Sequence, residues 1–335
     1  MDTNRHTILL PHDGSDFDHW RQVVRALWAQ QIPPQAMDWL TEAHQQHSPD
    51  LFASTPAITS AADIAQWPAW QPPPCALTVS RSWLQQAEQA LLNAAPERFA
   101  VLYRLLWRMQ TTAGLRHDVL DADYVQMQHW IHAVRREVHK MHAFVRFRPV
   151  ALPSAAHDGD GPLHVAWFEP THHITQAAAP FFVRRFANMR WAILTPQCSL
   201  RWWPQAPSIA SLAQHGITAN HALQPLPGRA GVLSWGPGAQ ASDAPAPDAG
   251  EGLWLTYYAH TFNPARLKVA TMRREMPRKY WHNLPEAQLI TPLVQAAHAR
   301  SGAMLANAAT TPQRKLPRAR PRAATVHPAS DALSR

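Results

Sequence analysis

The residues with the clearest chemical potential lie in segment 263–287, where positive charge and aromatic rings occur together. Guanidinium and ammonium groups bind phosphate oxygens, and neighbouring rings can stack on unpaired bases. The segment therefore predicts contact with nucleic acid, although a solvated basic helix with buried rings would have the same composition. Its basic residues are Arg266, Lys268, Arg273, Arg274, Arg278 and Lys279, and the rings that follow them are Tyr280 and Trp281.

Two further groups of basic residues could extend such a surface if the fold brings them together. One group lies where a predicted helix passes into a strand, and the other lies near the end of the next helix. A groove built from these groups would follow a phosphate backbone. The full set predicted to bind nucleic acid is Arg135, Arg136, Lys140, Arg146, Arg148, Arg184, Arg185, Arg266, Arg273, Arg274, Arg278, Lys279, Tyr280 and Trp281.

A second hypothesis concerns histidines and one carboxylate that are close in the sequence. His139 and His142 are three residues apart on a predicted helix, while Glu169 and His172 follow a predicted strand. Imidazole and carboxylate groups bind zinc and exchange protons, so these four are the candidate catalytic residues of a metal-assisted enzyme acting on nucleic acid. Their spacing matches no established ligand motif. Histidines hydrogen-bonded within the fold are the simpler interpretation, and we predict neither a metal site nor a cofactor.

Several enzyme motifs are absent from the sequence. There is no GxxxxGK[ST] or GxGxxG phosphate-binding loop, no GxSxG elbow, no HExxH and no CxxC. These absences disfavour several enzyme classes, but they leave open whether the chain is an enzyme. A third hypothesis is therefore a protein-binding adaptor without nucleic-acid contact.

Hydrophobic periodicity predicts the elements that must position these residues. In the first half, a short strand at 6–10 precedes a helix that begins near residue 15 or 16, and Pro33-Pro34 opens a second helix through Leu40. A strong helix follows over 96–110. The longest periodic run is a helix seam expected in the core, formed by Tyr124, Met127, Ile131, Val134, Val138 and Met141.

The second half changes to the alternation typical of strands. Segments 144–150 and 163–169 predict a hairpin, a helix follows over 171–186, and 190–195, 199–203 and 231–235 are further strands. Helices are predicted over 253–262, from Asn263-Pro264 to Pro277, and over 285–300. The fold class is therefore α+β, with a helical N-terminal half, a central mostly antiparallel sheet with a crossing helix, C-terminal helices and a disordered basic tail.

The 335 residues predict one domain over 1–303, with Pro-rich loops at 46–76, 204–230 and 236–251. Residues 304–335 are rich in Ala, Pro and Arg, a composition that cannot bury a core. Beyond residue 312, six basic residues face a single acid, so this tail carries five of the eight net positive charges. Two cysteines, no signal peptide and no apolar run of about 18 residues predict a cytoplasmic protein.

The chain also resembles the bacterial family called domain of unknown function 4130. The resemblance covers most of residues 5–300 and rests on PERFAVLYRLLWRMQ, VRREVHKMHAFVRFR, VAWFEPTHHI, APFFVRRFANMRWAILTP and FNPARLKVATMRREMPRKYWHNLPEA. It implies a DNA-repair or DNA-metabolism protein that acts with a DNA-repair radical SAM protein or a uracil-DNA glycosylase-like protein. It implies no catalytic residues, and the chain has no iron–sulfur cysteine set. Our leading hypothesis is therefore a DNA-binding accessory protein with such a partner.

Overall fold

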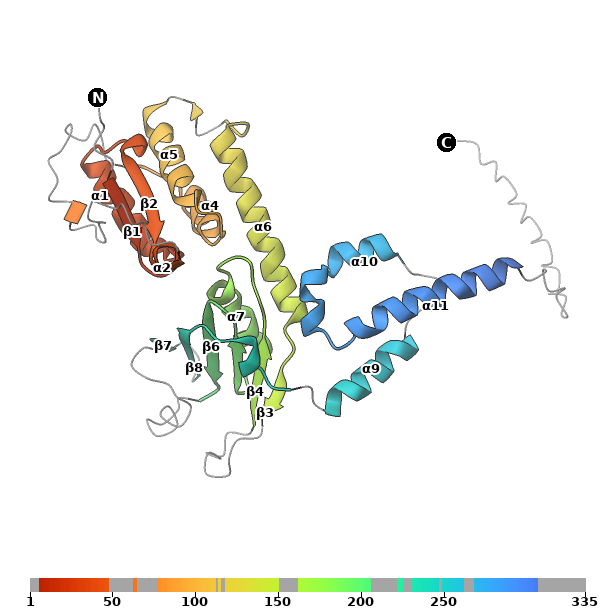
Figure 1. The fold of residues 1–335 in the computed structure, drawn as a ribbon. Helices are drawn as coiled ribbons and strands as arrows, with labels where there is room; N and C mark the ends of the chain where they lie inside the picture. The colour runs from red at the N-terminus through yellow and green to blue at the C-terminus, as the bar shows by residue number, and fades with distance from the viewer. Residues whose placement is uncertain are drawn as a thin grey trace, which may run out of the picture.

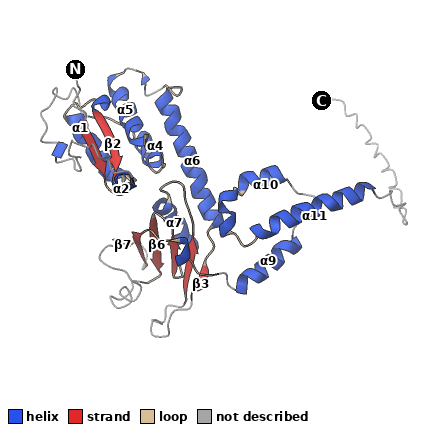
Figure 2. Ribbon diagram, in the orientation of Figure 1, coloured by secondary structure: helices blue, strands red, loops and turns tan. Residues whose placement is uncertain are grey.

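The computed structural model describes residues 6–47, 63–64, 77–112, 114–115, 118–150, 162–205, 222–225, 231–246, 249–261 and 268–306 (Figure 1). Helix α6 (Ala122–Phe144) runs between an N-terminal group of elements and a group built on a larger sheet. The C-terminal helices gather beside the C-terminal end of α6, and Figure 2 shows the two sheets as separate pieces. No helix in these ranges combines the length and apolar character needed to cross a bilayer.

The N-terminal group begins with a strand–helix–strand unit. Strand β1 (His6–Leu10) and strand β2 (Met37–Thr41) pair in parallel, with Ile8 opposite Trp39, and α1 (Phe17–Ala29) forms the crossover. The predicted helix through Leu40 is therefore wrong. Pro33-Pro34 leads into a single 3-10 turn, η1 (Pro34–Ala36), and the backbone that follows hydrogen-bonds to β1 instead of to itself.

Helices cover this unit and close the first core. They are α4 (Arg81–Leu91), α5 (Arg98–Thr111) and the first half of α6, while the short α2 (Glu42–His47) directly follows β2. The α1 N-cap is Asp16, whose side chain accepts from the backbone of His19, as the sequence predicted for the start of this helix. Tyr103 lies in the centre and donates its hydroxyl to the Ile32 carbonyl at 2.6 Å.

Helix α6 belongs to both hydrophobic cores. Met127, Trp130 and Ile131 pack in the first core, while Val134 and Met141 pack in the second. The predicted helix seam is thus confirmed as core, although one seam serves two clusters of side chains. One rigid helix therefore fixes the two groups to each other.

The larger sheet has the strand order β3-β4-β5-β6-β8-β7. Among these strands only β4 and β5 pair in parallel, and helix α7 (Thr175–Arg185) crosses between them. The mostly antiparallel sheet with a crossing helix is confirmed, and so is the β3–β4 hairpin. The strands are β3 (Arg148–Val150), β4 (Leu163–Trp167), β5 (Trp191–Leu194), β6 (Cys198–Trp203), β7 (Ala222–Pro225) and β8 (Val232–Pro237).

Some predicted boundaries in this region are wrong. The first hairpin strand does not begin at residue 144, because α6 continues to Phe144 and the strand itself comprises only Arg148–Val150. Strand β7 lies inside the segment predicted as a Pro-rich loop at 204–230. Its partner β8 supplies the hydrogen bonds that a local sequence pattern cannot reveal.

The C-terminal elements are α9 (Ala249–Thr261), α10 (Val269–Glu275), the 3-10 helix η6 (Arg278–Asn283) and α11 (Ala287–Ala306). Pro277 ends α10 as predicted, whereas the predicted helix start at Asn263-Pro264 lies outside the described residues. The loop predicted at 236–251 is shorter than expected, since it contains the 3-10 turn η4 (Ala241–Asp243) and reaches α9 at Ala249. The tail beyond Ala306 and most of 46–76 also lie outside the described residues.

The turn after β1 depends on one glycine. Gly14 has φ +73°, and a Cβ at this position would lie 2.5 Å from Cζ of Phe99. We expect Gly14→Ala to lower the free energy of unfolding by about 1–3 kcal/mol, because it adds both backbone strain and a clash in the core. Urea unfolding measures the change.

Gly252→Ala is the matched control, because no atom lies within 4 Å of a Cβ built there. Gly252 also lies in helix α9, where alanine is the better helix former. We expect this variant to be as stable as the parent or more stable. Equal losses for the two variants would show that the turn after β1 does not need a glycine.

Candidate functional site

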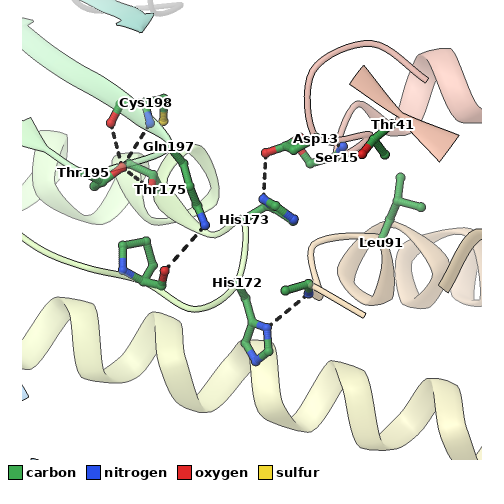
Figure 3. A network of polar contacts seen from close by, with 12 residues as sticks. Asp13, Ser15, Thr41, Leu91, His172, His173, Thr175, Thr195, Gln197 and Cys198 are labelled. Carbon is green, nitrogen blue, oxygen red and sulfur yellow. Dashed lines mark hydrogen bonds and ion pairs between the residues drawn. The ribbon is translucent and has the colours of Figure 1, made fainter. Parts of the chain in front are cut away.

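The short loop of residues 170–174, which follows β4, is bound to several distant parts of the chain. The backbone N–H of His173 donates to the Leu92 carbonyl at 2.8 Å, just after α4. Nδ1 of His172 accepts from the backbone N–H of Ala94 at 3.2 Å. These two bonds hold the loop against the connection between α4 and α5, as Figure 3 shows for His172.

The strongest anchor of the 170–174 loop is Glu137, which is only 5% exposed on α6. Its Oε2 accepts from the backbone N–H of His172 at 2.7 Å. Its Oε1 accepts from Nζ of Lys279 at 2.6 Å and from the hydroxyl of Tyr280 at 3.0 Å. One carboxylate thus joins α6, the loop and η6.

Glu137 stays ionised in this position. Burial by itself raises the pKa of its carboxyl group, but Lys279 and the backbone N–H groups of Thr171 and His172 outweigh burial. The net result is a pKa below the usual value for glutamate. A buried charge that is fully hydrogen-bonded is costly to alter, so this group is a structural anchor.

Lys279 and Tyr280 complete the anchor from the side of η6. Nζ of Lys279 also donates to Oγ1 of Thr171 at 2.8 Å, while half of its side chain remains exposed. Tyr280 is 2% exposed and stacks on Phe168 with ring centroids 5.2 Å apart. Burial, with the Glu137 charge, raises the pKa of Tyr280, so its hydroxyl remains a donor.

Asp13 and His173 connect the N-terminal group to the loop. Oδ2 of Asp13, directly after β1, lies 2.7 Å from Nδ1 of His173 (Figure 3). Burial by itself raises the pKa of Asp13, but His173 and the hydrogen bonds from Ser15 lower this pKa by a larger amount. The carboxyl group is therefore ionised. The N-terminal group and the loop after β4 thereby meet at this one contact.

Arg98 fixes the backbone beside this ion pair. It is 2% exposed, and its guanidinium donates to the carbonyls of Leu91, Ala95 and Asp13. It also lies 4.0 Å from the ring centre of Phe99. Burial lowers the pKa of Arg98 to about 10, which leaves it charged. Because carbonyls occupy this guanidinium, we assign it a structural role.

A cavity of about 330 Å³ opens between these groups. It lies where the carboxyl ends of the parallel strands β1 and β2 meet the 170–174 loop. In open parallel α/β sheets ligands bind beyond the carboxyl ends of the strands, and the two-stranded β1–β2 pair presents the same edge to this cavity. The polar side chains in its wall, apart from Arg98, are Asp13, Thr41, His44, Thr171, His173 and Gln197.

Cys198 lies behind the cavity but does not offer a nucleophile. Burial raises the pKa of its thiol to about 11, so the reactive thiolate is not formed near neutral pH. The hydroxyl of Thr195 donates to the Cys198 carbonyl at 2.7 Å, which ties the turn between β5 and β6 (Figure 3). The thiol therefore packs as part of the fold.

The structure does not bring the four candidate catalytic residues into one site. His142 stacks on Phe181 with centroids 4.0 Å apart, and exposed His139 lies on the surface of α6. Glu169 accepts from Nε1 of Trp167 at 2.8 Å and lies 3.4 Å from His282. His172 is held by Ala94 and Glu137, as described above. Within the described ranges no three potential ligands are close enough to hold a metal ion.

The structure divides the predicted nucleic-acid-binding residues into two classes. Four of them form ion pairs with carboxylates far away in the sequence: Lys140 with Glu275, Arg146 with Glu286, Arg148 with Glu251, and Lys279 with Glu137. The exposed ones are Arg135, Arg136, Arg184, Arg185, Arg273, Arg274 and Arg278, while Arg266 lies outside the described residues.

The predicted aromatic surface is smaller than expected. The prediction that a base stacks on Tyr280 is wrong, because the ring is buried against Phe168 and Phe144. Trp281 is half-buried and donates Nε1 to the Met276 carbonyl at 2.9 Å. The Arg278 guanidinium lies 5.6 Å from the Trp281 ring centre, so this pair keeps one partly exposed ring beside a cation.

The sequence interpretation missed Asp13, Arg98, Glu137 and Gln197. A signal for Glu137 was present, since it lies three residues after Val134 and four before Met141, on the apolar seam. An acid at a seam position must be paired when it is buried. Asp13 could have been found only with β2 in place, because the parallel pair defines the edge of the sheet on which it lies.

The Glu137 anchor predicts a large effect from a small change. We expect Glu137→Gln to lower the free energy of unfolding by about 1–3 kcal/mol, because the amide keeps the shape but loses the charge that pairs with Lys279. Urea unfolding provides the measurement. The control is Glu88→Gln, at an exposed position of α4. An equal, small loss in both variants would contradict the anchoring role.

Stability should also fall on acidification. Burial, the largest effect, lowers the pKa of His172, so the unfolded chain binds more protons below about pH 6.5. The free energy of unfolding therefore decreases as pH falls through this range, and ionised Glu137 and Asp13 add a further loss below about pH 4.5. Melting temperatures from pH 8 to 4 test this.

His172→Gln should reduce the change in melting temperature between pH 7 and 5. The matched control, His132→Gln, alters an exposed histidine of α6 and should keep the parental pH dependence. If the two variants show the same pH dependence, the neutral, buried state of His172 is not its source.

A comparison with protein-family models finds one match, over residues 96–286, and its description is a domain of unknown function, DUF4130. The match includes Arg98, Glu137, His173 and Lys279, whereas Asp13 precedes it. No curated protein and no solved structure matches the chain. Because the matched residues make up more than half of its length, the chain belongs to the family of the domain of unknown function 4130.

Proposed function

We propose that this protein binds nucleic acid through an exposed arginine set around α6, as an accessory protein in DNA repair or DNA metabolism. The observation that carries the proposal is the state of these side chains. They are exposed, and they form no ion pair with a carboxylate of the described residues. The exposed arginine set comprises Arg136, Arg184, Arg185, Arg273 and Arg278.

The arginines come from elements that contact α6. Arg136 lies close enough to Tyr280 of η6 for its charge to lower the pKa of the tyrosine hydroxyl, although burial raises the same pKa by more. On the side of α7, Arg184 acts together with burial to lower the pKa of His142. Helix α10 is joined to α6 by Nζ of Lys140, which donates to the Glu275 carbonyl at 2.6 Å. Positive charge from three elements therefore lies next to one helix.

This arrangement suits a phosphate backbone. The planar guanidinium group donates two parallel hydrogen bonds to a phosphate, and exposed arginines need no internal partner to be displaced first. The internally paired cations, such as Lys140 and Arg148, instead hold the surface in shape. The Arg278–Trp281 pair adds one ring on which a base could stack.

The biological setting of the proposal comes from the family resemblance in the sequence. We propose DNA as the nucleic acid, and a DNA-repair radical SAM protein or a uracil-DNA glycosylase-like protein as the partner. The alternative is a protein-binding adaptor. In that case, capture of the partner would withstand nuclease treatment and the purified chain would not bind DNA.

The proposal predicts binding that depends steeply on salt. We expect Arg273→Gln/Arg278→Gln to weaken binding of the full chain to duplex DNA and to reduce the slope of log K against log salt by up to about 2, since each lost phosphate contact removes about 0.9. Fluorescence anisotropy across a salt series, with single- and double-stranded DNA, measures both quantities.

The control is a variant with the same change in net charge, but with its two substitutions far from α10 and η6. Arg25→Gln/Arg81→Gln alters exposed arginines of α1 and of the α4 N-terminus, and should keep the parental slope. An equal decrease in both variants would show non-specific attraction by net charge. No binding by the parent chain would overturn the proposed function.

The basic tail makes a separate prediction. Changing Arg314, Arg318, Arg320 and Arg322 to Gln in the full chain should weaken binding to all DNA sequences alike and flatten its salt dependence, because counterion release is independent of sequence. Unchanged affinity and slope would assign the binding to residues that precede Arg314. Competition between unrelated duplexes of equal length checks that the loss is uniform.

A further inference from the structure

The cavity beside Asp13 and His173 is lined by no member of the exposed arginine set, and its chemistry differs from that of the set. We infer that it takes a single unpaired nucleobase of the bound nucleic acid. This inference rests on the proposed function and names the part of the ligand that the folded core would recognise.

The charges in the cavity wall are balanced within the protein. The Asp13 carboxylate lies 2.7 Å from Nδ1 of His173, and its negative charge also acts on Arg98, whose guanidinium is bound to backbone carbonyls. No described cation in the wall is therefore left to receive a phosphate. The ligand that fits such a wall is neutral, with hydrogen-bonding groups of its own.

The remaining polar side chains are suited to the edge of a heterocycle. Gln197 is exposed, and its Nε2 makes only a long contact of 3.5 Å with the Pro170 carbonyl. Its carboxamide therefore has a donor and an acceptor to offer, the pair with which glutamine reads a base edge. Thr41 and His44 lie on the other side, with 3.3 Å between Oγ1 and Nδ1.

The arrangement in Figure 3 places these groups on opposite sides of one space. Asp13, Ser15 and Thr41 come from the N-terminal group, and Gln197 and His173 come from the sheet group. The His173 ring meets Asp13 through one nitrogen, and its other nitrogen points away from Asp13. A ring inserted here would contact both groups of elements at once.

The size and the rim of the cavity agree with a base on a chain. A volume of about 330 Å³ is at the lower end of the range for small-molecule sites and is enough for a single base. At the rim, Oγ1 of Thr171 accepts from half-exposed Lys279, and Arg278 is the preceding residue. A base in the cavity would thus leave its phosphate beside the cations of η6.

The test uses the full chain and two probes. The first probe is an oligonucleotide that carries one 2-aminopurine, whose fluorescence rises when the base leaves the stack, while anisotropy reports total binding. The second probe is a set of free nucleosides, titrated by isothermal titration calorimetry. We expect a fluorescence rise on binding and measurable affinity for at least one nucleoside.

Gln197→Ala is the diagnostic variant, because this exposed side chain can be shortened without opening the core. We expect it to lower nucleoside affinity by about tenfold, the effect of losing one bidentate contact. The fluorescence rise at saturating protein should decrease far more than the anisotropy. Gln85→Ala, at an exposed position of α4, is the matched control and should behave as the parent chain.

The outcomes separate the two proposals. DNA binding without a fluorescence rise and without nucleoside binding would overturn the base-binding cavity and leave the proposed function in place. Nucleoside binding that is lost in Gln197→Ala, with no binding to DNA, would support the cavity and overturn backbone binding. Nucleoside binding that Gln197→Ala leaves unchanged would place the base elsewhere and overturn the inference.

Discussion

The fold depends on one buried carboxylate. Glu137 accepts hydrogen bonds from Lys279, Tyr280 and the backbone of the 170–174 loop, and so joins α6 to segments that follow it by 35 to 143 residues in the sequence. Removing a carboxylate from water is costly, and only a complete set of donors offsets that cost. The site therefore forms only when all of these segments are in place, which couples the sheet group to the C-terminal elements.

The 170–174 loop also fixes the position of the N-terminal group. Because Glu137 and Leu92 fix the backbone of His172 and His173, the His173 ring is held where Asp13 can meet it. Arg98 fixes the Asp13 backbone from the opposite side. The cavity between them is thus built from two groups of elements whose relative position is set by α6 and by ion pairs, rather than by one continuous sheet.

Positive charge serves two physical purposes in this chain. Lys140, Arg146, Arg148 and Lys279 each pair with a carboxylate far away in the sequence, and these pairs connect the C-terminal elements to α6 and the sheet. The exposed arginine set around α6 forms no such ion pair with the described carboxylates. Sequence composition counts both kinds alike, so net charge alone overstates the surface that remains for a polyanion.

The sequence by itself determined the elements whose signal is local. Helical periodicity predicted α5 and the core seam of α6, and alternation predicted the β3–β4 hairpin and β6, because side-chain burial repeats with the period of the backbone. The strands β2 and β7 and the composition of the site were set only by the tertiary structure. Strand β2 becomes a strand by pairing with β1, and Glu137 meets Lys279 across 142 residues of chain. Contacts over such separations leave no period in the sequence, since they depend on how the elements pack and on which charges remain unpaired afterwards.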